Sequence, residues 1–172
     1  MSARLPRIVI VDHYDSYTRN LLSLLSESID STPTSEEIAA RVVVLPHTHP
    51  ALSPENFAAE LLPNVDALIL SPGPGVSTRK EDFGTSEALL RRPDLVQVPI
   101  LGICLGHQGI ATTLGGSMRR LKSPVHGTKR ALSVVRGTSR IMDGIDDGTE
   151  MVCYNSLVVD EKSAYSLTST SS

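Results

Sequence analysis

The 172-residue sequence contains no tryptophan, and aromatic residues make up only 3% of it. A surface that stacks the bases of single-stranded nucleic acid needs aromatic side chains, so this composition disfavours such a protein. An excess of positive charge is also lacking, because the formal net charge is -3. We therefore expect neither nucleic acid nor an anionic membrane as a partner.

Cysteine is nearly absent, with only Cys104 and Cys153 in the chain. Two cysteines could form one disulfide, but small secreted domains carry a much denser framework. The first apolar run, Ile8–Val11, is broken by Asp12 and is too short for a signal-peptide core or a membrane span. We expect a cytoplasmic protein, and nothing in the sequence predicts a metal ion or a cofactor.

Short apolar runs alternate with helical patterns over the first two thirds of the chain. The expected strands are Ile8–Val11, Arg41–Leu45, Ala67–Leu70 and Pro99–Ile103, and the expected helices are Tyr17–Ser28 with Ser16 as its cap, Ser53–Leu62, 82–91 and Leu105–Leu114. This alternation predicts an α/β domain over 1–162, whose mostly parallel sheet has helices on both faces. Further strands at Ala131–Val135 and Thr149–Tyr154 predict an antiparallel extension, and the Ser/Thr-rich segment 163–172 is expected to be disordered.

Gly102-Ile103-Cys104-Leu105-Gly106 lies where a predicted strand meets a predicted helix. Gly-x-Cys-x-Gly at such a junction is typical of a nucleophile elbow, in which a tight turn presents the central side chain above the sheet. The helix N-terminus should favour thiolate, and the N–H of Leu105 should face an oxyanion. The alternative is a buried cysteine between packing glycines. Cys153 lies in an apolar strand pattern and is better interpreted as a core residue.

Ser71-Pro72-Gly73-Pro74-Gly75 follows the third predicted strand. The glycines allow a sharp turn and leave amides free to donate to a ligand, although Pro and Gly also specify rigid turns that have no function. Ligands of open α/β sheets bind at the carboxyl ends of the strands, where Cys104 is also expected. The two motifs therefore support each other.

Together these segments resemble class I glutamine amidotransferases, particularly the glutaminases of aminodeoxychorismate synthase and anthranilate synthase. The matching stretches, in the family's order from residue 8 to about 160, are Ile10–Tyr17 with Asn20-Leu21, Leu70–Gly75, Gly102–Gln108 with Leu114–Gly116, Ser123–Gly127 and Tyr154–Val159. The resemblance implies a flavodoxin-like fold. Other α/β folds with a cysteine elbow, such as the DJ-1-like group, do not explain the Pro-Gly loop together with Tyr154-Asn155-Ser156-Leu157.

The resemblance also implies a chemistry. Cys104 would attack the side-chain amide of glutamine, and the amides of Gly75 and Leu105 would hold the oxyanion. Glutamine would be bound by the loop Gly73-Pro74-Gly75, by Leu105 and Gln108, and by the pair Ser156-Leu157. Ammonia would pass to a chorismate-using synthase domain or subunit. Leu121-Lys122-Ser123-Pro124 favours the aminodeoxychorismate branch over the anthranilate branch.

The family's catalytic base and its orienting carboxylate come from a late His-x-Glu motif, and this sequence has none. None of its histidines, His13, His47, His49, His107 and His126, has Glu two positions on. His13-Tyr14-Asp15 is only superficially similar, because it aligns with the loop after the first strand. Asn155 also stands where relatives commonly have His. The sequence therefore suggests that the last strands and helix of the family are missing.

Three interpretations remain open. The chain is a truncated amidotransferase, an inactive homologue that binds glutamine or a synthase, or a protein whose site a partner chain completes. In each case we expect little glutaminase turnover from the chain alone, because nucleophile and base act as a unit.

Overall fold

The computed structural model describes residues 6–29, 36, 39–134 and 140–163. Its main sheet contains four parallel strands, β1 (Ile8–Asp12), β2 (Val42–Pro46), β3 (Ala67–Leu70) and β4 (Ile100–Gly102), in the order β2-β1-β3-β4. Ile8 of β1 lies opposite Val42 of β2 and Ala67 of β3, so the strands start level and their carboxyl ends share one edge. The predicted α/β fold with a largely parallel sheet is confirmed.

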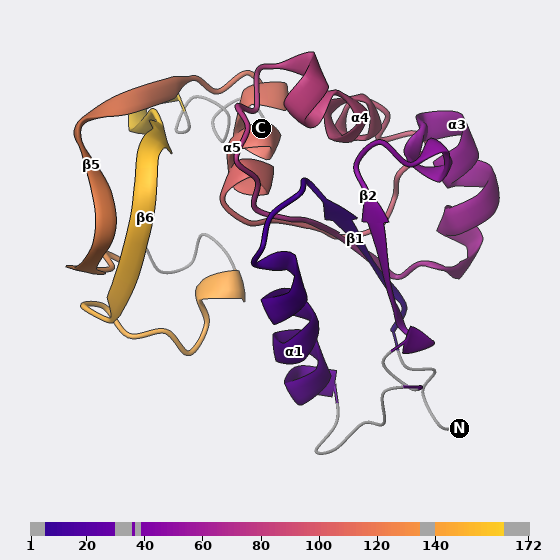
Figure 1. The fold of residues 1–172 in the computed structure, drawn as a ribbon, viewed down its shortest axis with the longest axis horizontal. Helices are drawn as coiled ribbons and strands as arrows, with labels where there is room; N and C mark the ends of the chain where they lie inside the picture. The colour runs from indigo at the N-terminus through magenta and orange to yellow at the C-terminus, as the bar shows by residue number, and fades with distance from the viewer. Residues whose placement is uncertain (1–5, 30–35, 37–38, 135–139, 164–172) are drawn as a thin grey trace.

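Helices cover both faces of this sheet (Figure 1). Alternate residues of one strand point to opposite sides, so Val9 and Val11 join one core cluster and Ile10 joins the other. The larger cluster packs against α4 (Lys80–Leu90) and α5 (Leu105–Thr113), and the smaller one against α1 (Thr18–Ile29). Burial on both faces explains why these strands are short, uninterrupted apolar runs.

The helix expected for Ser53–Leu62 is present, but its hydrogen-bonding type changes along its length. After the 3-10 turn η1 (Pro50–Leu52), it continues without a break from α3 (Pro54–Asn56) through a π-helical turn η2 (Phe57–Leu61) to a 3-10 turn η3 (Leu62–Asn64). Ser53 does cap this segment, because its Oγ accepts from the Asn56 N–H at 3.3 Å. Phe57 is fully buried in the larger core cluster. Pro63, which has no N–H to donate, stands where the last regular turn would lie.

The first turn of α1 is held differently from the expectation that Ser16 caps it. Asp15 Oδ1 accepts from the Tyr17 N–H at 2.7 Å, and Asp12 Oδ1 accepts from Thr18 Oγ1 at 2.7 Å. Two carboxylates therefore satisfy groups at the start of the helix, where negative charge is favourable.

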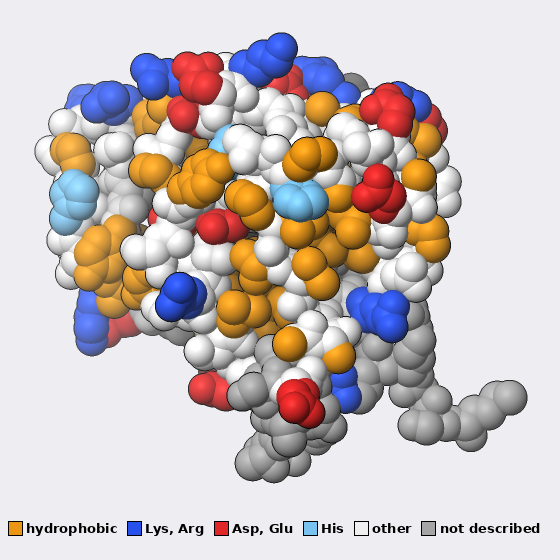
Figure 2. All heavy atoms as spheres, turned by 45° about the vertical axis from the view of Figure 1, so that its right-hand side comes forward, with side chains coloured by type: hydrophobic (Ala, Val, Ile, Leu, Met, Phe, Trp, Pro, Cys, Tyr) orange, Lys and Arg blue, Asp and Glu red, His pale blue; other side chains and the backbone are white. Residues whose placement is uncertain are grey.

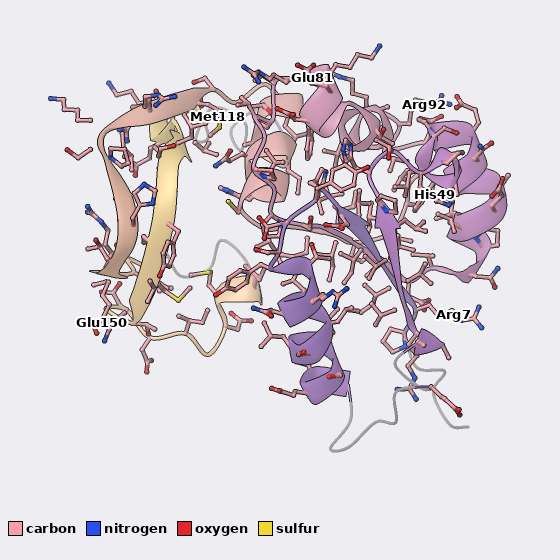
Figure 3. The ribbon with its side chains drawn as sticks, viewed as in Figure 1. Arg7, His49, Glu81, Arg92, Met118 and Glu150 are labelled. Carbon is pink, nitrogen blue, oxygen red and sulfur yellow. The ribbon has the colours of Figure 1, made fainter. Side chains whose placement is uncertain are left out.

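The antiparallel extension is a two-stranded hairpin of β5 (Met118–Ala131) and β6 (Glu150–Val159). Figure 3 shows Met118 and Glu150 at opposite ends of it. The extension is confirmed, but the strand expected at Ala131–Val135 is wrong over its described residues, because β5 begins at Met118 and ends at Ala131. Val135 lies outside the described residues. The basic residues of β5 conceal the strand in the sequence, because they break the apolar pattern on its exposed side. The expected disordered tail, apart from Ser163, lies outside the described residues.

Apolar side chains remain at the surface on the outer strands, including Val43 of β2 and Leu101 of β4. Figure 2 shows apolar side chains across the middle of one face, with charged side chains around its rim. In the part of the chain that the structure describes, β4 is the last strand on its side of the sheet. No described helix has the length and hydrophobicity needed to cross a bilayer.

Two leucines provide a test of this core. Leu89 on α4 is fully buried, whereas Leu24 on α1 is 59% exposed. We expect Leu89→Ala to lower the free energy of unfolding by about 2–5 kcal/mol, because it removes buried methyl groups and leaves a cavity. Leu24→Ala should change that free energy by less than about 0.5 kcal/mol. Urea unfolding of both variants measures the difference, and equal losses would contradict the proposed core.

Candidate functional site

Cys104 occupies a sharp bend between β4 and α5. Its backbone has φ 52° and ψ -105°, a strained conformation for a residue with a side chain. The glycines on either side are required for close packing. A Cβ on Gly102 would lie 2.5 Å from the Gly106 carbonyl carbon, and a Cβ on Gly106 would overlap the carbonyl oxygen of Leu70. The geometry expected of a nucleophile elbow is therefore present.

The Pro-Gly loop lies beside this bend. The Gly106 N–H donates to the Ser71 carbonyl at 3.2 Å, and the Ile103 N–H donates to the Leu70 carbonyl at 3.0 Å. Gly73 is closely packed too, because a Cβ there would lie 2.5 Å from Leu105 Cδ2. Adjacent parallel strands, β3 and β4, thus bring both motifs to one edge of the sheet. Their juxtaposition is as the sequence predicted.

The far end of the loop is anchored to α4. The Val76 N–H donates to Asp82 Oδ2 at 2.8 Å, and a Cβ on Gly75 would lie 2.5 Å from the Asp82 Cβ. The Gly75 N–H has no acceptor among the described residues. This amide is available to a ligand, and it lies two residues after Gly73, which packs against Leu105 of the elbow helix. An unsatisfied donor on such a loop is what an oxyanion hole needs.

The thiol of Cys104 is electrostatically less favourable than the sequence suggested. Cys104 is an exposed residue, but partial burial of its sulfur raises the thiol pKa, and the carboxylate of Asp15 raises it further. The Leu105 N–H at the start of α5 acts in the opposite direction. The net shift is therefore the reverse of the thiolate preference expected at a helix N-terminus, because desolvation penalises the charged form.

The other expected ligand-binding residues divide into two groups. Gln108 is half-buried in the first turn of α5, where its N–H donates to the Cys104 carbonyl at 2.9 Å. Ser156 and Leu157 are half-buried on β6, a strand that contacts α5. The side chain of Asn155 donates to the Leu157 carbonyl at 3.3 Å. No hydrogen bond joins Ser156 or Leu157 to Cys104 or to the Pro-Gly loop in the described residues, so their role in binding glutamine stays a prediction.

None of the five histidines hydrogen-bonds the sulfur of Cys104 in the described structure. His13, the residue of the superficial His-x-acid pair, is buried, and both of its ring nitrogens already contact serines. The described residues therefore hold a nucleophile position and amide donors without a histidine base.

A buried aromatic stack under the Pro-Gly loop was not expected from the sequence. His13 stacks on Phe83 at 5.2 Å and on His47 at 5.5 Å, and the ring of Tyr14 meets His47 edge-on at 5.0 Å. Burial lowers the pKa of His13 to about 4 and also lowers the pKa of His47. His47 Nδ1 has no hydrogen-bond partner among the described residues. Both rings are therefore neutral near pH 7. The stack joins residues that lie far apart in the sequence, so no local sequence pattern predicts it.

The fold and the bend define an α/β domain with a cysteine presented at a strand-to-helix elbow. The family model of class I glutamine amidotransferases matches residues 9–172, which is nearly the whole chain. This chain belongs to the class I glutamine amidotransferase family.

Curated relatives carry the names of chorismate-using synthases. Aminodeoxychorismate synthase of Streptomyces griseus is 36% identical over 155 residues, which cover 90% of this chain and 19% of that protein. Anthranilate synthase component 2 of Methanothermobacter thermautotrophicus is 34% identical over 157 residues, covering 88% of this chain and 70% of that protein. This chain therefore spans only about a fifth of the S. griseus relative.

Solved structures share the fold. A candidate GMP synthase component from Thermoplasma acidophilum superposes with a TM-score of 0.68 at 23% identity, covering 91% of this chain and 68% of that one. A glutamine amidotransferase from Thermotoga maritima gives a TM-score of 0.62 at 15% identity, covering 91% and 63%.

The influence of Asp15 on the thiol is testable. Asp15→Asn removes the charge but keeps an oxygen that can accept the Tyr17 N–H, so we expect the pKa of Cys104 to fall. The rate of alkylation by iodoacetamide should then rise at any pH below that pKa, since the thiolate is the nucleophile. The pH dependence of the rate gives the pKa. Asp94→Asn is the control because Asp94 pairs with Arg92. An unchanged pKa in Asp15→Asn would contradict the proposed influence.

The buried His13 should make stability depend on pH. Its pKa is about 4 in the folded protein against an ordinary 6.5, so the unfolded chain binds a proton first as the pH falls. The stability contributed by neutral His13 is complete above pH 6.5 and is lost between pH 6.5 and 4, by up to about 1.4 kcal/mol per pH unit. Urea unfolding measured across this pH range should show that the free energy of unfolding depends less steeply on pH in His13→Gln than in the parent chain. Identical slopes would exclude His13 as the titrating group.

Proposed function

We propose that this chain is the glutaminase part of a chorismate-aminating synthase and that Cys104 is its nucleophile. The observation that carries the proposal is the strained cysteine bend beside the Pro-Gly loop, whose Gly75 N–H has no acceptor among the described residues, in a member of the class I glutamine amidotransferase family. Gly73, Pro74, Leu105, Gln108, Ser156 and Leu157 would complete the glutamine site.

At a site completed by a base, these groups would carry out the following reaction. The thiolate of Cys104 attacks the side-chain amide carbon of glutamine, and the carbonyl oxygen becomes an oxyanion that accepts from the Gly75 and Leu105 N–H groups. When this intermediate collapses, the C–N bond breaks, the amine takes up the proton that the thiol gave up and leaves as ammonia, and a glutamyl thioester remains. Water then hydrolyses the thioester, which releases glutamate and regenerates the thiol. Ammonia would be used by a synthase domain or subunit to aminate chorismate.

The weak point of this site is proton transfer. The thiol pKa is raised, and no histidine hydrogen-bonds the sulfur in the described residues. The 172-residue sequence also contains no His-x-Glu motif. We therefore infer that this chain, taken by itself, binds glutamine without turning it over at an appreciable rate.

For the branch of metabolism, we favour the aminodeoxychorismate branch, which leads to para-aminobenzoate and folate. The S. griseus relative and the segment Leu121-Lys122-Ser123-Pro124 support it. The anthranilate branch is the second candidate, and the 34% identical component 2, of which this chain covers 70%, supports that assignment. A non-catalytic homologue that only binds glutamine or a synthase is the candidate from another class.

Two measurements on the purified chain test the proposal. Ammonia release from glutamine should be at least about 10⁴-fold slower than at a complete site, because a missing base disables the unit. The glutamine-like electrophile 6-diazo-5-oxo-L-norleucine should still label the chain, as detected by intact mass, and L-glutamine should protect against it. Cys104→Ala should abolish labelling, and Cys153→Ala should not.

The outcomes separate the candidates. Glutamine hydrolysis that disappears in Cys104→Ala would refute the predicted inactivity but support the nucleophile. If the analogue does not label the chain, or if L-glutamine does not slow the labelling, the glutamine site is refuted. The non-catalytic interaction protein would then be the remaining candidate.

A further inference from the structure

His13 connects the end of β1 to the start of the Pro-Gly loop. Its backbone N–H donates to Ser71 Oγ at 2.9 Å, and its ring Nδ1 lies 3.3 Å from the same oxygen. The hydroxyl of Ser71 donates its own proton to the Pro72 carbonyl at 2.7 Å. Ser71 therefore has no proton left for the ring, and His13 Nδ1 must carry hydrogen and act as the donor.

The other ring nitrogen reaches α4. His13 Nε2 lies 2.9 Å from Ser86 Oγ, and with the proton on Nδ1 this nitrogen accepts from the serine hydroxyl. Phe83, one turn earlier on the same helix, stacks against the ring with an interplanar angle of 17°. A neutral ring with one donor and one acceptor satisfies both serines, whereas a charged ring, with two donors, would require the Ser86 hydroxyl to turn round and accept.

The loop is thereby fixed to α4 at both ends. Ser71 is tied to it through His13 and Ser86, and Val76 is tied to it directly by Asp82. Between these ties Gly73 is closely packed, because a Cβ there would be 2.8 Å from the His13 Cβ and 2.5 Å from Leu105 Cδ2. His13 and Leu105 of the elbow helix therefore both pack against the loop at Gly73.

We propose that His13 is a positioning residue, which holds the Ser71–Gly75 loop where the Gly75 N–H can donate to the carbonyl oxygen on the carbon that Cys104 attacks. The inference rests on the proposed glutaminase chemistry. It adds the residue that determines the position of one oxyanion donor, the Gly75 N–H. His13 touches neither substrate nor sulfur, and it acts through Ser71 and Gly73. A histidine that merely fills the core would stabilise the chain without this effect on the donor.

Two reagents on the same sulfur separate positioning from stability. Iodoacetamide reports only whether the thiol is accessible and ionised, whereas 6-diazo-5-oxo-L-norleucine must also enter the glutamine site. In His13→Ala we expect the rate constant for labelling by the glutamine analogue to fall by about tenfold or more, since a displaced Gly75 N–H can no longer donate to the bound analogue. The rate constant for iodoacetamide should stay within about twofold of the parent value, since the bend itself is unchanged.

Rescue adds a readout that packing alone does not provide. The amide nitrogen of Asn can replace Nδ1 as a donor to Ser71, so His13→Asn should restore the analogue rate to within about threefold. The amide of Gln extends towards the place of Nε2, so His13→Gln should restore it less. His126→Ala, which removes an exposed histidine of the hairpin, is the matched control and should leave both rates unchanged.

If His13→Ala does not fold, Ser86→Ala serves instead, because it keeps the ring but removes the partner of Nε2. It should lower the ratio of the analogue rate to the iodoacetamide rate. Equal losses with both reagents, or an unchanged ratio in the folded variants, would overturn the positioning role. A parent chain that the analogue labels without protection by glutamine would instead refute the proposed function.

Discussion

The contact between Gly106 and the backbone of Leu70 is the constraint on which the site depends. The elbow helix approaches the end of β3 so closely that any side chain at position 106 would overlap the Leu70 carbonyl. This contact allows Gly106 to donate to Ser71 and brings the Pro-Gly loop next to the cysteine. Without it, the loop and the thiol would be two unrelated features of neighbouring strands.

The same closeness has an electrostatic consequence. Partial burial raises the pKa of Cys104 and outweighs the Leu105 N–H, while Asp15 acts in the same direction as burial. A thiol with a raised pKa needs a base more than an activated thiol does. The geometry of the elbow and the acidity of its thiol are therefore distinct properties. This chain has the elbow geometry, but its thiol pKa is raised rather than lowered.

The stack of His13, Phe83 and His47 shows how the fold uses titratable groups without charging them. Burial keeps His13 neutral, and a neutral imidazole offers the one donor and one acceptor that Ser71 and Ser86 require. His13 is thus a neutral hydrogen-bonding group that links the start of the Pro-Gly loop to α4. In a member of the class I glutamine amidotransferase family, the position of the Pro-Gly loop matters, because one donor of the proposed oxyanion hole lies at the end of this loop.

The sequence alone determined the parallel sheet, its two covered faces and the position of the elbow, because short β-branched runs and Gly-x-Cys-x-Gly are local signals. It misplaced the first hairpin strand, since the charges of β5 hide its period. It also missed the π- and 3-10-helical turns at 57–64, within the helix that it did predict, and the carboxylate caps of α1. Only the tertiary structure decided the thiol pKa, the free Gly75 amide and the partners of His13. These depend on burial and on contacts such as His13 with Ser86, 73 positions apart, which no local pattern encodes.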